Sequence, residues 1–530
     1  MRSLSLFLRA AIGCGFAAVT AQAAIAETFT FQREHVLGTS LEVRVEADST
    51  AAAEAAEQRV VAEIERLSKI ISSYDPSSEL SRWQARVGES STLSPELYDL
   101  LRVSDRWREA TGSAYNPAVE SLSQLWRAAE KSGIAPGEDA LRAATVRLQN
   151  PQWRLDASSN QVSRTSDLPL SFNAIGKGMI VDLACAQALK GEQVQGALVA
   201  IGGDMRAVGT FVERVAIADP KNDAVNARPI GAVFLSGQGL ATSGSYRRGF
   251  RIGGRWYSHI LDPRTGKPAE GVASATVVAA TTAEANALST SCNVLGADDG
   301  LALVASIEGA ECLLVLADGS QRKSAGWDDL AQPGLYRRAE RATQFVAAEG
   351  EPATDKPAAA KEKPELLELV VDFKLARSQG RGYRRPYVAI WLEDADEFPV
   401  RTAVLWMQTK EPGPRWHRDL IRWYRNDRTR KLADETDLIG VISGATRGPG
   451  EYKAVFDGLD DSGKPLKPGK YTLYVEAARE HGTYQIIRQP LTLGTDPIAS
   501  TKLKSNAEFE SVSYEYRAPA ASGKNKPAAR

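Results

Sequence analysis

Residues 239–271 read GLATSGSYRRGFRIGGRWYSHILDPRTGKPAEG, and the other elements of the first domain can be placed around this stretch. Gly253 and Gly254 interrupt a strand-like run, which predicts a β-hairpin with a glycine turn. His259 follows directly and precedes Ile260-Leu261-Asp262-Pro263. The chain contains four histidines, so one that is held between two structured elements is a candidate proton-transfer group. A partly buried histidine without a chemical role is the alternative that this stretch alone leaves open.

The sequence on both sides of this stretch predicts a mixture of strands and helices. Residues 196–201 predict a buried strand, and Gly202-Gly203-Asp204 closes it with glycines that allow a ligand to approach the backbone. Residues 282–295 predict a helix on which Asn286 and Thr290, four residues apart, share one face. The other predicted elements are a strand pair at 28–45 with a turn at Gly38-Thr39, a helix from about Thr50, a helix between the cap Ser94 and Gly112, a helix at 174–189, and strands at 272–280 and 312–316.

The last third of the chain has a different composition and a different spacing of apolar residues. Residues 347–364, AAEGEPATDKPAAAKEKP, lack apolar periodicity and predict a linker. Short runs with aromatic residues then alternate with turn clusters, which favours an all-β sandwich. The stretch WHRDLIRWYR at 416–425 predicts either a strand pair with stacked Arg and Trp side chains or a surface for an anionic or protein partner. The predicted strands are 366–375, 387–392, 402–407, 438–442, 452–456 and 470–476.

Composition limits the classes of partner and the compartment. The 530-residue chain has a net charge of −1, so nucleic-acid binding is not expected. Early positive charge, an apolar run at 10–19 and the small-residue site Ala24-Ile25-Ala26, with 21–23 as an alternative cut, predict an export signal. No segment approaches the roughly 20 uninterrupted apolar residues of a membrane span. We therefore expect an exported, periplasmic protein, with membrane association through a lipoprotein-type Cys14 as the weaker alternative.

The three other cysteines, Cys185, Cys292 and Cys312, are widely spaced and form no C-x-x-C pair. This spacing predicts neither a zinc site nor a disulfide framework. At most one bridge is open to them, and their apolar surroundings favour buried free thiols.

Short motifs follow one another along the first part of the chain. They are LGT (37–39), SYDP (73–76), TGSAYNP (111–117), IGKG (175–178) with Asp182, IGGD (201–204), DP (219–220), ATSGSY (241–246), HILDP (259–263) and ALST (287–290). In this order they resemble the ApbE-type FAD:protein FMN transferases, exported enzymes that attach FMN covalently to a protein threonine. Each motif is weak alone, but the ordered series from about residue 35 to 335 is specific.

The resemblance implies an α+β fold, with an ApbE-like (T-fold-like) flavin transferase domain followed by an all-β immunoglobulin-like sandwich. The second part resembles an exported immunoglobulin-like module through FDG at 456–458, DSGK at 461–464 and PGKY at 468–471. The expected organisation is a signal peptide at 1–26, the transferase domain at 27–346, a disordered linker at 347–365, the β domain at 366–517 and a disordered tail at 518–530.

The implied reaction is a phosphoryl transfer in which FAD is a substrate. A threonine hydroxyl attacks the phosphorus on the FMN side of FAD, and AMP leaves; this needs a cation, a base and positioning. The family pattern implies His259 as the base, and Mg²⁺ against the Ala174 carbonyl oxygen and the side chains of Asn286 and Thr290. The residues implied to contact FAD are Leu37, Tyr74, Ala114, Tyr115, Asn116, Ser171, Lys177 and Ile260.

Three positions depart from the family in the same direction. Asn116, Ser171 and Asn286 stand where the family usually has Asp. Mg²⁺ prefers charged oxygen ligands, so an amide at position 286 should lower metal affinity. The alternative to the enzyme is therefore a catalytically attenuated flavin-binding or electron-transfer protein of the same fold.

The β domain contains a sequence that resembles a flavin acceptor. Ser443-Gly444-Ala445-Thr446 matches the S-G-A-T sequence flavinylated in subunits of the sodium-translocating quinone reductase, although Gly440 and Val441 stand where an Asp is usual. The acceptor implied by the resemblance is an exported flavoprotein, or this chain's own Thr446. An ordinary loop of small residues is the alternative, and a further hypothesis makes the β domain an adaptor that recruits a redox partner.

Overall fold

The computed structural model describes residues 26–332 and 367–518, without 157, 159, 160, 223, 225, 246 and 247 in the first range and without 378–384, 409–416, 435–437, 445 and 480–482 in the second. The signal peptide up to residue 25, the linker and the tail from residue 519 lie outside the described residues, so these predictions are not tested.

A central sheet organises the first part of the chain. It has eight strands in the order β1-β2-β6-β7-β10-β13-β14-β15, and every neighbouring pair is antiparallel. Leu41, Val43 and Val45 are buried on one face of β2 while the residues between them are more exposed, as a strand in a layered fold requires. The strands are β1 (Glu27–Val36), β2 (Thr39–Ala47), β6 (Val194–Ile201), β7 (Asp204–Gly209), β10 (Gly239–Gly244), β13 (Val272–Ala279), β14 (Glu311–Leu316) and β15 (Gln321–Lys323).

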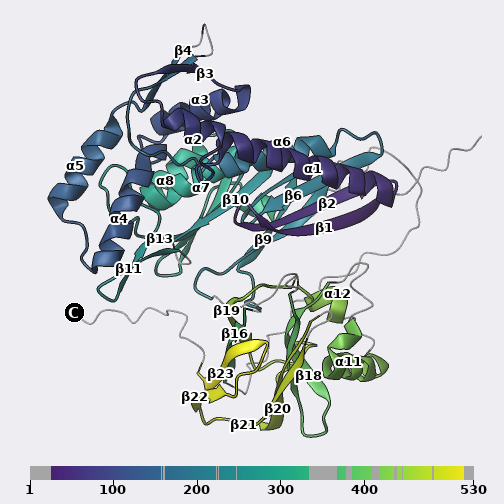
Figure 1. Cartoon of the computed structure of the whole chain (residues 1–530). Coiled ribbons are helices and arrows are strands. Elements are labelled where there is room, and N and C mark those ends of the chain that lie inside the picture. Colours follow the sequence, from purple (N-terminus) through teal and green to yellow (C-terminus); the bar gives the residue numbers. More distant parts are fainter. Residues whose placement is uncertain are drawn as a thin grey trace, which may run out of the picture.

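Helices cover one face of this sheet. The helices α1 (Thr50–Ile71), α6 (Gly176–Ala188) and α7 (Thr282–Leu295) pack on it around Val43, Val199 and Val277. Figure 1 shows α1 and α6 lying across the sheet. The other helices are α2 (Glu79–Gln84), α3 (Pro95–Ala110), the 3₁₀ turn η1 (Pro117–Val119), α4 (Glu120–Ser132), α5 (Glu138–Gln149), α8 (Ala297–Ala305) and α9 (Trp327–Leu330); a small sheet of β3 (Ser90–Thr92), β5 (Gln161–Arg164) and β4 (Trp153–Asp156) lies among them.

A two-stranded hairpin packs on the other face of the sheet. Strands β8 (Val212–Ile217) and β9 (Gly231–Ser236) are antiparallel. Val215 and Val233 of this hairpin share a second core with Leu198, Leu240 and Leu313 of the sheet. The first part of the chain is therefore layered as helices, sheet and hairpin.

The helices and strands predicted for the first part of the chain are confirmed. Ser94 caps α3, because its Oγ accepts a hydrogen bond from the backbone N–H of Leu97, and α7 spans the predicted residues. The predicted hairpin consists of β11 (Gly249–Ile252) and β12 (Arg255–Ser258). Gly253 and Gly254 turn it with φ of 56° and 80°, values that favour glycine. The described cysteines are buried and free, as expected.

The last part of the chain is a sandwich of two four-stranded sheets, ordered β19-β16-β23-β22 and β18-β17-β20-β21. Phe373, Trp406, Phe456 and Leu473 are buried in the core between these sheets. The strands are β16 (Glu368–Leu375), β17 (Tyr387–Glu393), β18 (Pro399–Trp406), β19 (Gly450–Phe456), β20 (Gly469–Ala478), β21 (Tyr484–Leu493), β22 (Ile498–Leu503) and β23 (Phe509–Arg517).

Two segments of this part differ from the prediction. The expected strand at 438–442 is the short helix α12 (Leu438–Ile442), and α11 (Ile421–Asp434) occupies much of the Arg/Trp-rich stretch that was expected to form a strand pair. Buried Leu420, Trp423 and Asp427 recur at helical spacing. The Glu476 carboxylate of β20 also accepts the backbone N–H groups of residues 422 and 423 at 2.9 Å, and this distant cap favours the helix.

The two parts touch through the connection between β8 and β9. The Asn226 side chain donates to the Val455 carbonyl oxygen at 2.6 Å and accepts from the Val455 N–H at 2.9 Å. Arg228 forms an ion pair with Asp457 beside it. Val455 lies in β19, an edge strand, so Asn226 satisfies backbone groups that the sheet leaves open. The sandwich lies beside β9, on the side of the sheet away from α1 and α6 (Figure 1).

Candidate active site

The packing of α6 against α7 builds the centre of the site. Gly178 of α6 lies so close to the start of α7 that a Cβ there would lie 2.6 Å from the Thr282 carbonyl oxygen. Asp182, one turn further, accepts the N–H groups of Thr282 at 2.9 Å and Ala283 at 3.0 Å. Its carboxylate thus caps α7 from a neighbouring helix. Gly178 leaves room for the start of α7, and Asp182 caps it. Together these two residues fix the position of α7 against α6.

α7 presents the two predicted metal-binding side chains. Asn286 is 5% exposed and Thr290 is half-buried. The Thr290 hydroxyl lies 3.2 Å from the Ser243 Oγ of β10, and Ser243 Oγ is also 2.9 Å from Ser289 Oγ. Ser243 belongs to the ATSGSY motif, but the sequence alone does not single it out as a site residue. Nothing local indicates that β10 packs against α7.

Lys177 and Asp204 form a partly buried ion pair beside Asn286. The Lys177 Nζ lies 2.8 Å from Asp204 Oδ2, and Asp204 is 2% exposed. Burial raises the pKa of the Asp204 carboxyl group, while the charge of Lys177 and the polar side chain of Asn286 oppose the rise. Among the described residues, no well-directed hydrogen bond reaches Oδ2, so the contact with Lys177 is mainly ionic.

The donor set fits a hard cation. Ala174 lies in the turn before α6, and the predicted ligands there and on α7 are a carbonyl, an amide and a hydroxyl oxygen. Asp204 adds a buried carboxylate nearby, whose Oδ2 is paired with the Lys177 ammonium group. In the described part of the chain, no three His, Cys, Asp or Glu side chains gather closely enough to form a metal site of the more usual kind.

The turn before α6 also suits a phosphate. No side chain caps the N-terminus of α6. The Gly176 N–H is bonded to the Phe172 carbonyl oxygen, so among the described residues the next N–H groups, those of Lys177 and Gly178, are the ones available to an anion. Lys177 stands in the first turn of the helix with its side chain one-third exposed. The diphosphate of a dinucleotide would find both a helix N-terminus and an ammonium group there.

His259 is held as a neutral base would be. Its Nδ1 donates to the Arg248 carbonyl oxygen at 3.0 Å, because a carbonyl can only accept. Although the residue is exposed, the protein atoms around its ring lower the pKa of His259 below its ordinary value. A neutral ring with a proton on Nδ1 leaves Nε2 free to accept one. In the described structure, no hydrogen bond joins His259 to Asn286 or Thr290.

The segment after His259 is anchored on both sides. The Ile260 carbonyl oxygen accepts the N–H of Ala269 at 2.8 Å, and Ile260 itself is 8% exposed. Trp126 of α4 donates from Nε1 to the Gly266 carbonyl oxygen at 2.9 Å. This loop therefore keeps His259 at the end of β12.

Tyr74 is the most exposed of the predicted flavin contacts. It is 80% exposed, and its hydroxyl group accepts a hydrogen bond from Asn173 Nδ2 at 2.8 Å. Asn173 directly precedes Ala174, so the ring stands beside the turn that carries the predicted metal ligand. Leu37 is 36% exposed with φ of 49°, and it is followed by Gly38 in the turn between β1 and β2. An exposed aromatic ring at such a site suits stacking on a flavin.

Other predicted flavin contacts have side chains that serve the fold. Asn116 Oδ1 accepts the N–H of Ala118 at 3.0 Å, and its Nδ2 donates to the Leu148 carbonyl oxygen at 3.1 Å. The Tyr115 hydroxyl lies 3.1 Å from Ser104 Oγ in the core. Ala114 is 2% exposed, and Ser171 is half-buried with its N–H bonded to the Pro117 carbonyl oxygen. The amide at position 116 is therefore needed as a donor, which a carboxylate could not be.

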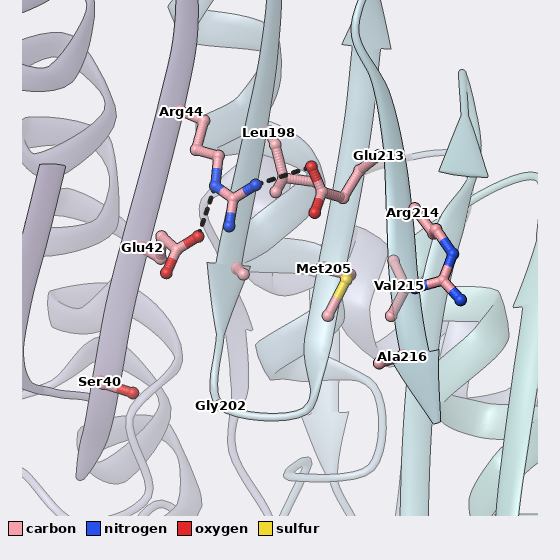
Figure 2. A pocket seen from close by; sticks show the side chains of 11 residues that line it. Ser40, Glu42, Arg44, Leu198, Gly202, Met205, Glu213, Arg214, Val215 and Ala216 are labelled. Atoms are coloured by element: carbon pink, nitrogen blue, oxygen red, sulfur yellow. Dashed lines mark hydrogen bonds and ion pairs between the residues drawn. The ribbon is translucent and has the colours of Figure 1, made fainter. Parts of the chain in front are cut away.

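A cavity of about 270 Å³ lies on the hairpin side of the sheet. Figure 2 shows Arg44 of β2 between Glu42 and Glu213, with distances of 2.6 and 2.8 Å to their carboxylate oxygens. Burial raises the pKa of Glu213, and Arg44 opposes this rise. These charged groups satisfy one another, and the residues that line the cavity do not include the predicted site residues.

The predicted acceptor Thr446 lies in the sandwich part of the chain, between α12 and β19. Gly444 pairs with β18 through two backbone hydrogen bonds, to the Leu405 carbonyl oxygen and from the Met407 N–H. Thr446 is half-buried, and its carbonyl oxygen accepts from Arg385 Nη1 at 3.0 Å. The guanidinium group of Arg447 lies 5.0 Å from the centre of the Trp406 ring. Ala445 lies outside the described residues.

Sequence comparisons find known proteins that are similar to each of the two parts of the chain. Residues 368–511 match a family model described as a predicted periplasmic protein (DUF2271). Curated proteins named FAD:protein FMN transferase are similar to the first part: one from Treponema pallidum is 31% identical over 315 residues, which cover 55% of this chain and 86% of the relative. One from Escherichia coli K12 is 28% identical over 284 residues, 50% of this chain and 78% of the relative. No helix among the described residues is long and apolar enough to cross a membrane.

The fold of the first part is also similar to a solved structure. The crystal structure of the ApbE protein from Thermotoga maritima superposes with a TM-score of 0.52 at 26% identity, covering 58% of this chain and all of that one. Residues 37–314, more than half of the chain, match the family model described as the ApbE family. The chain therefore belongs to the ApbE family.

Proposed function

We propose that this protein transfers FMN from FAD to a threonine hydroxyl of an exported redox protein, with release of AMP. The observation that carries the proposal is the meeting of α6 and α7. There the Lys177–Asp204 pair, Asn286 and the uncapped helix N-terminus combine cation and diphosphate chemistry in one place. Relatives named FAD:protein FMN transferase support the choice of reaction.

The chemistry assigned to the protein is a displacement at phosphorus. The threonine oxygen forms a bond to the FMN-side phosphorus of FAD, and the bond from this phosphorus to the bridging oxygen breaks, so that AMP carries the bridging oxygen away. His259 Nε2 takes the proton of the attacking hydroxyl, since Nδ1 is committed to the Arg248 carbonyl oxygen. The N-terminus of α6 and Lys177 hold the phosphate oxygens.

Ala174, Asn286 and Thr290 would hold Mg²⁺, which when bound would stabilise the negative charge that grows on the phosphate oxygens. Ser243 keeps the Thr290 hydroxyl oriented through its contact at 3.2 Å. Asp182 and Gly178 fix the helix that carries both α7 ligands. Tyr74 would cover one face of the isoalloxazine ring.

The proposed site of action is the periplasm. The description of the DUF2271 family as periplasmic supports this compartment, and the predicted signal at residues 1–26 agrees with it. The acceptor is then an exported flavoprotein, and this chain's own Thr446 is one candidate. Its partly exposed position between Arg385 and Arg447 suits a phosphodiester, which these arginines would neutralise.

A flavin-holding protein without transferase activity is the second candidate. It is favoured by the uncharged nature of the three predicted metal ligands, Ala174, Asn286 and Thr290.

Product analysis separates the two candidates. The mature protein is incubated with FAD and Mg²⁺, with and without an extract of exported proteins, and free AMP is measured together with protein-bound flavin. Transfer predicts AMP and covalent FMN in equal amounts, both lost in EDTA. Tight FAD binding without AMP under every condition would establish the second candidate instead.

A further inference from the structure

Three hydroxyl groups form a chain between β10 and α7. The Ser243 Oγ of β10 lies 2.9 Å from Ser289 Oγ and 3.2 Å from Thr290 Oγ1 on α7. Ser289 Oγ also lies 3.1 Å from the main-chain carbonyl oxygen of Asn286, three residues earlier in the same helix. Ser289 is buried, whereas Ser243 and Thr290 are half-buried. The chain of hydroxyl groups therefore leads from a buried carbonyl oxygen to the side chain of a predicted metal ligand.

The main chains that carry these hydroxyl groups are bridged at the same level. The side chain of Asn293 on α7 is buried, and its Nδ2 group donates to the Ser243 carbonyl oxygen at 3.2 Å and to the Ser289 carbonyl oxygen at 2.9 Å. The strand and the helix are thus held together here by a contact that does not use the hydroxyl groups. Loss of a single hydroxyl group should leave the two elements in place.

The contacts allow one order of the hydroxyl protons. A carbonyl oxygen only accepts and each hydroxyl group donates one proton, so the Ser289 proton goes to the Asn286 carbonyl oxygen. The contact between Ser289 and Ser243 must then carry the Ser243 proton, since otherwise two oxygens would meet at 2.9 Å with no proton between them. The remaining contact, between Ser243 and Thr290, is therefore made by the Thr290 proton.

This order leaves the Thr290 oxygen with lone pairs and no proton for any other partner. A hydroxyl oxygen can bind a cation only through its lone pairs, with its proton turned away. We propose that Ser243 is a positioning residue of the candidate cation site: it takes the Thr290 proton, so that the Thr290 oxygen acts only as an acceptor, and Ser289 fixes this direction. The inference rests on the proposed role of Thr290 as a Mg²⁺ ligand, but it is testable without FAD.

The test measures Mn²⁺ binding by calorimetry in the mature full-length protein without FAD, and urea unfolding in EDTA checks that each variant is folded. Ser243→Ala removes the acceptor of the Thr290 proton, and we expect about fivefold weaker Mn²⁺ binding. Ser289→Ala keeps the contact between Ser243 and Thr290 but no longer fixes its direction. If the two directions are then equally populated, half of the molecules present the binding form, and Mn²⁺ binding should weaken about twofold.

The substitution Thr290→Val distinguishes a positioning role from a structural one. It removes the hydroxyl group through which Ser243 is proposed to act, so adding Ser243→Ala to Thr290→Val should cause no further loss of Mn²⁺ binding. A serine that only supported the fold would weaken binding by the same factor in both backgrounds. Thr242→Val is the matched control, because it removes another hydroxyl–hydroxyl contact of β10, at 3.0 Å to Thr276 Oγ1, and should bind Mn²⁺ as the wild type does.

If Thr290→Val binds Mn²⁺ too weakly for this comparison, the difference between Ser243→Ala and Thr242→Val decides. The inference is overturned by an unchanged affinity in Ser243→Ala or Ser289→Ala, by equal losses in Ser243→Ala and Thr242→Val, or by a wild type that binds no Mn²⁺. Failure of the proposed function has a different signature. In that case Mn²⁺ binding changes through the series as expected, while the wild type releases no AMP from FAD.

Discussion

His259 is the proposed base, and its surroundings favour the neutral, proton-accepting form of its ring. A lowered pKa means that the ring loses its proton at a lower pH than free histidine does, so the base form already dominates at neutral pH. We expect kcat/KM for AMP release to rise as pH increases through this lowered pKa and to be level above it. A profile that still rises between pH 7 and 8 would contradict the assignment, and initial rates from pH 5 to 8.5 are the measurement.

The substitution His259→Asn tests the proposed base without removing the hydrogen bond that positions it. An asparagine can still donate to the Arg248 carbonyl oxygen, which His259 Nδ1 contacts at 3.0 Å, but it cannot accept a proton. The rate of AMP release should fall by about 10²–10⁴, while the affinity for FAD stays close to that of the wild type. A variant that retains a rate within about tenfold of wild type would show that another group is the base.

Asn116, a predicted flavin contact, has an amide side chain that the fold itself uses. Its amide donates to the Leu148 carbonyl oxygen and accepts from the Ala118 N–H while only 3% of the residue is exposed. Asn116→Asp removes the donor and buries a charge, so we expect about 1–3 kcal/mol less stability and no gain in activity. Urea unfolding measures this, with the exposed Asn150→Asp as control. Equal stability of the two variants would mean that the hydrogen bond to Leu148 contributes little.

At the scale of elements, a helix can be predicted from the sequence when the residues that stabilise it lie close to it along the chain. The start of α3 is predictable because its cap, Ser94, directly precedes the helix. The helix α11 was not predictable, because Glu476 supplies its cap from a strand far along the chain. The candidate site follows the same rule: Asn286 and Thr290 share a helical face that the spacing predicts, whereas Asp204 meets Lys177 only through the folded sheet.

The contact between α6 and α7 gives a prediction at this scale. A Cβ on Gly178 would lie 2.6–2.7 Å from backbone atoms of Thr282 and Ala283, so Gly178→Ala must push α7 away. We expect a loss of about 1–3 kcal/mol and, because α7 carries Asn286 and Thr290, weaker Mn²⁺ binding. Gly176→Ala is the control, since its Cβ would meet only side-chain atoms at ordinary contact distances, Ile71 Cδ1 at 3.4 Å and Phe172 Cβ at 3.6 Å. Both effects should be absent there, and similar losses in the two variants would contradict the argument.

At the scale of the whole molecule, the two parts of the chain are placed by a small polar contact. Asn226 pairs with both backbone groups of Val455, and Arg228 pairs with Asp457, at the tip of the connection between β8 and β9. This connection belongs to the hairpin layer, whereas the candidate site is built on the helix layer. The sandwich that carries Thr446 is therefore docked on the opposite side of the sheet from α6 and α7 (Figure 1).

This placement predicts that flavinylation of Thr446, if it occurs at the proposed site, takes place between two chains. A mixture of His259→Asn, which keeps the acceptor, and Thr446→Val, which keeps the base, should yield FMN on the Thr446 peptide of the His259→Asn chain, detected by mass spectrometry. The rate per wild-type chain should also rise with protein concentration, because the donor and acceptor chains must meet. The combined variant Asn226→Ala and Arg228→Ala releases the docking contact and should make the rate less dependent on concentration. A concentration-independent rate in the wild type, with no adduct in the mixture, would show that the sandwich leaves its docked position and delivers Thr446 to the site of its own chain.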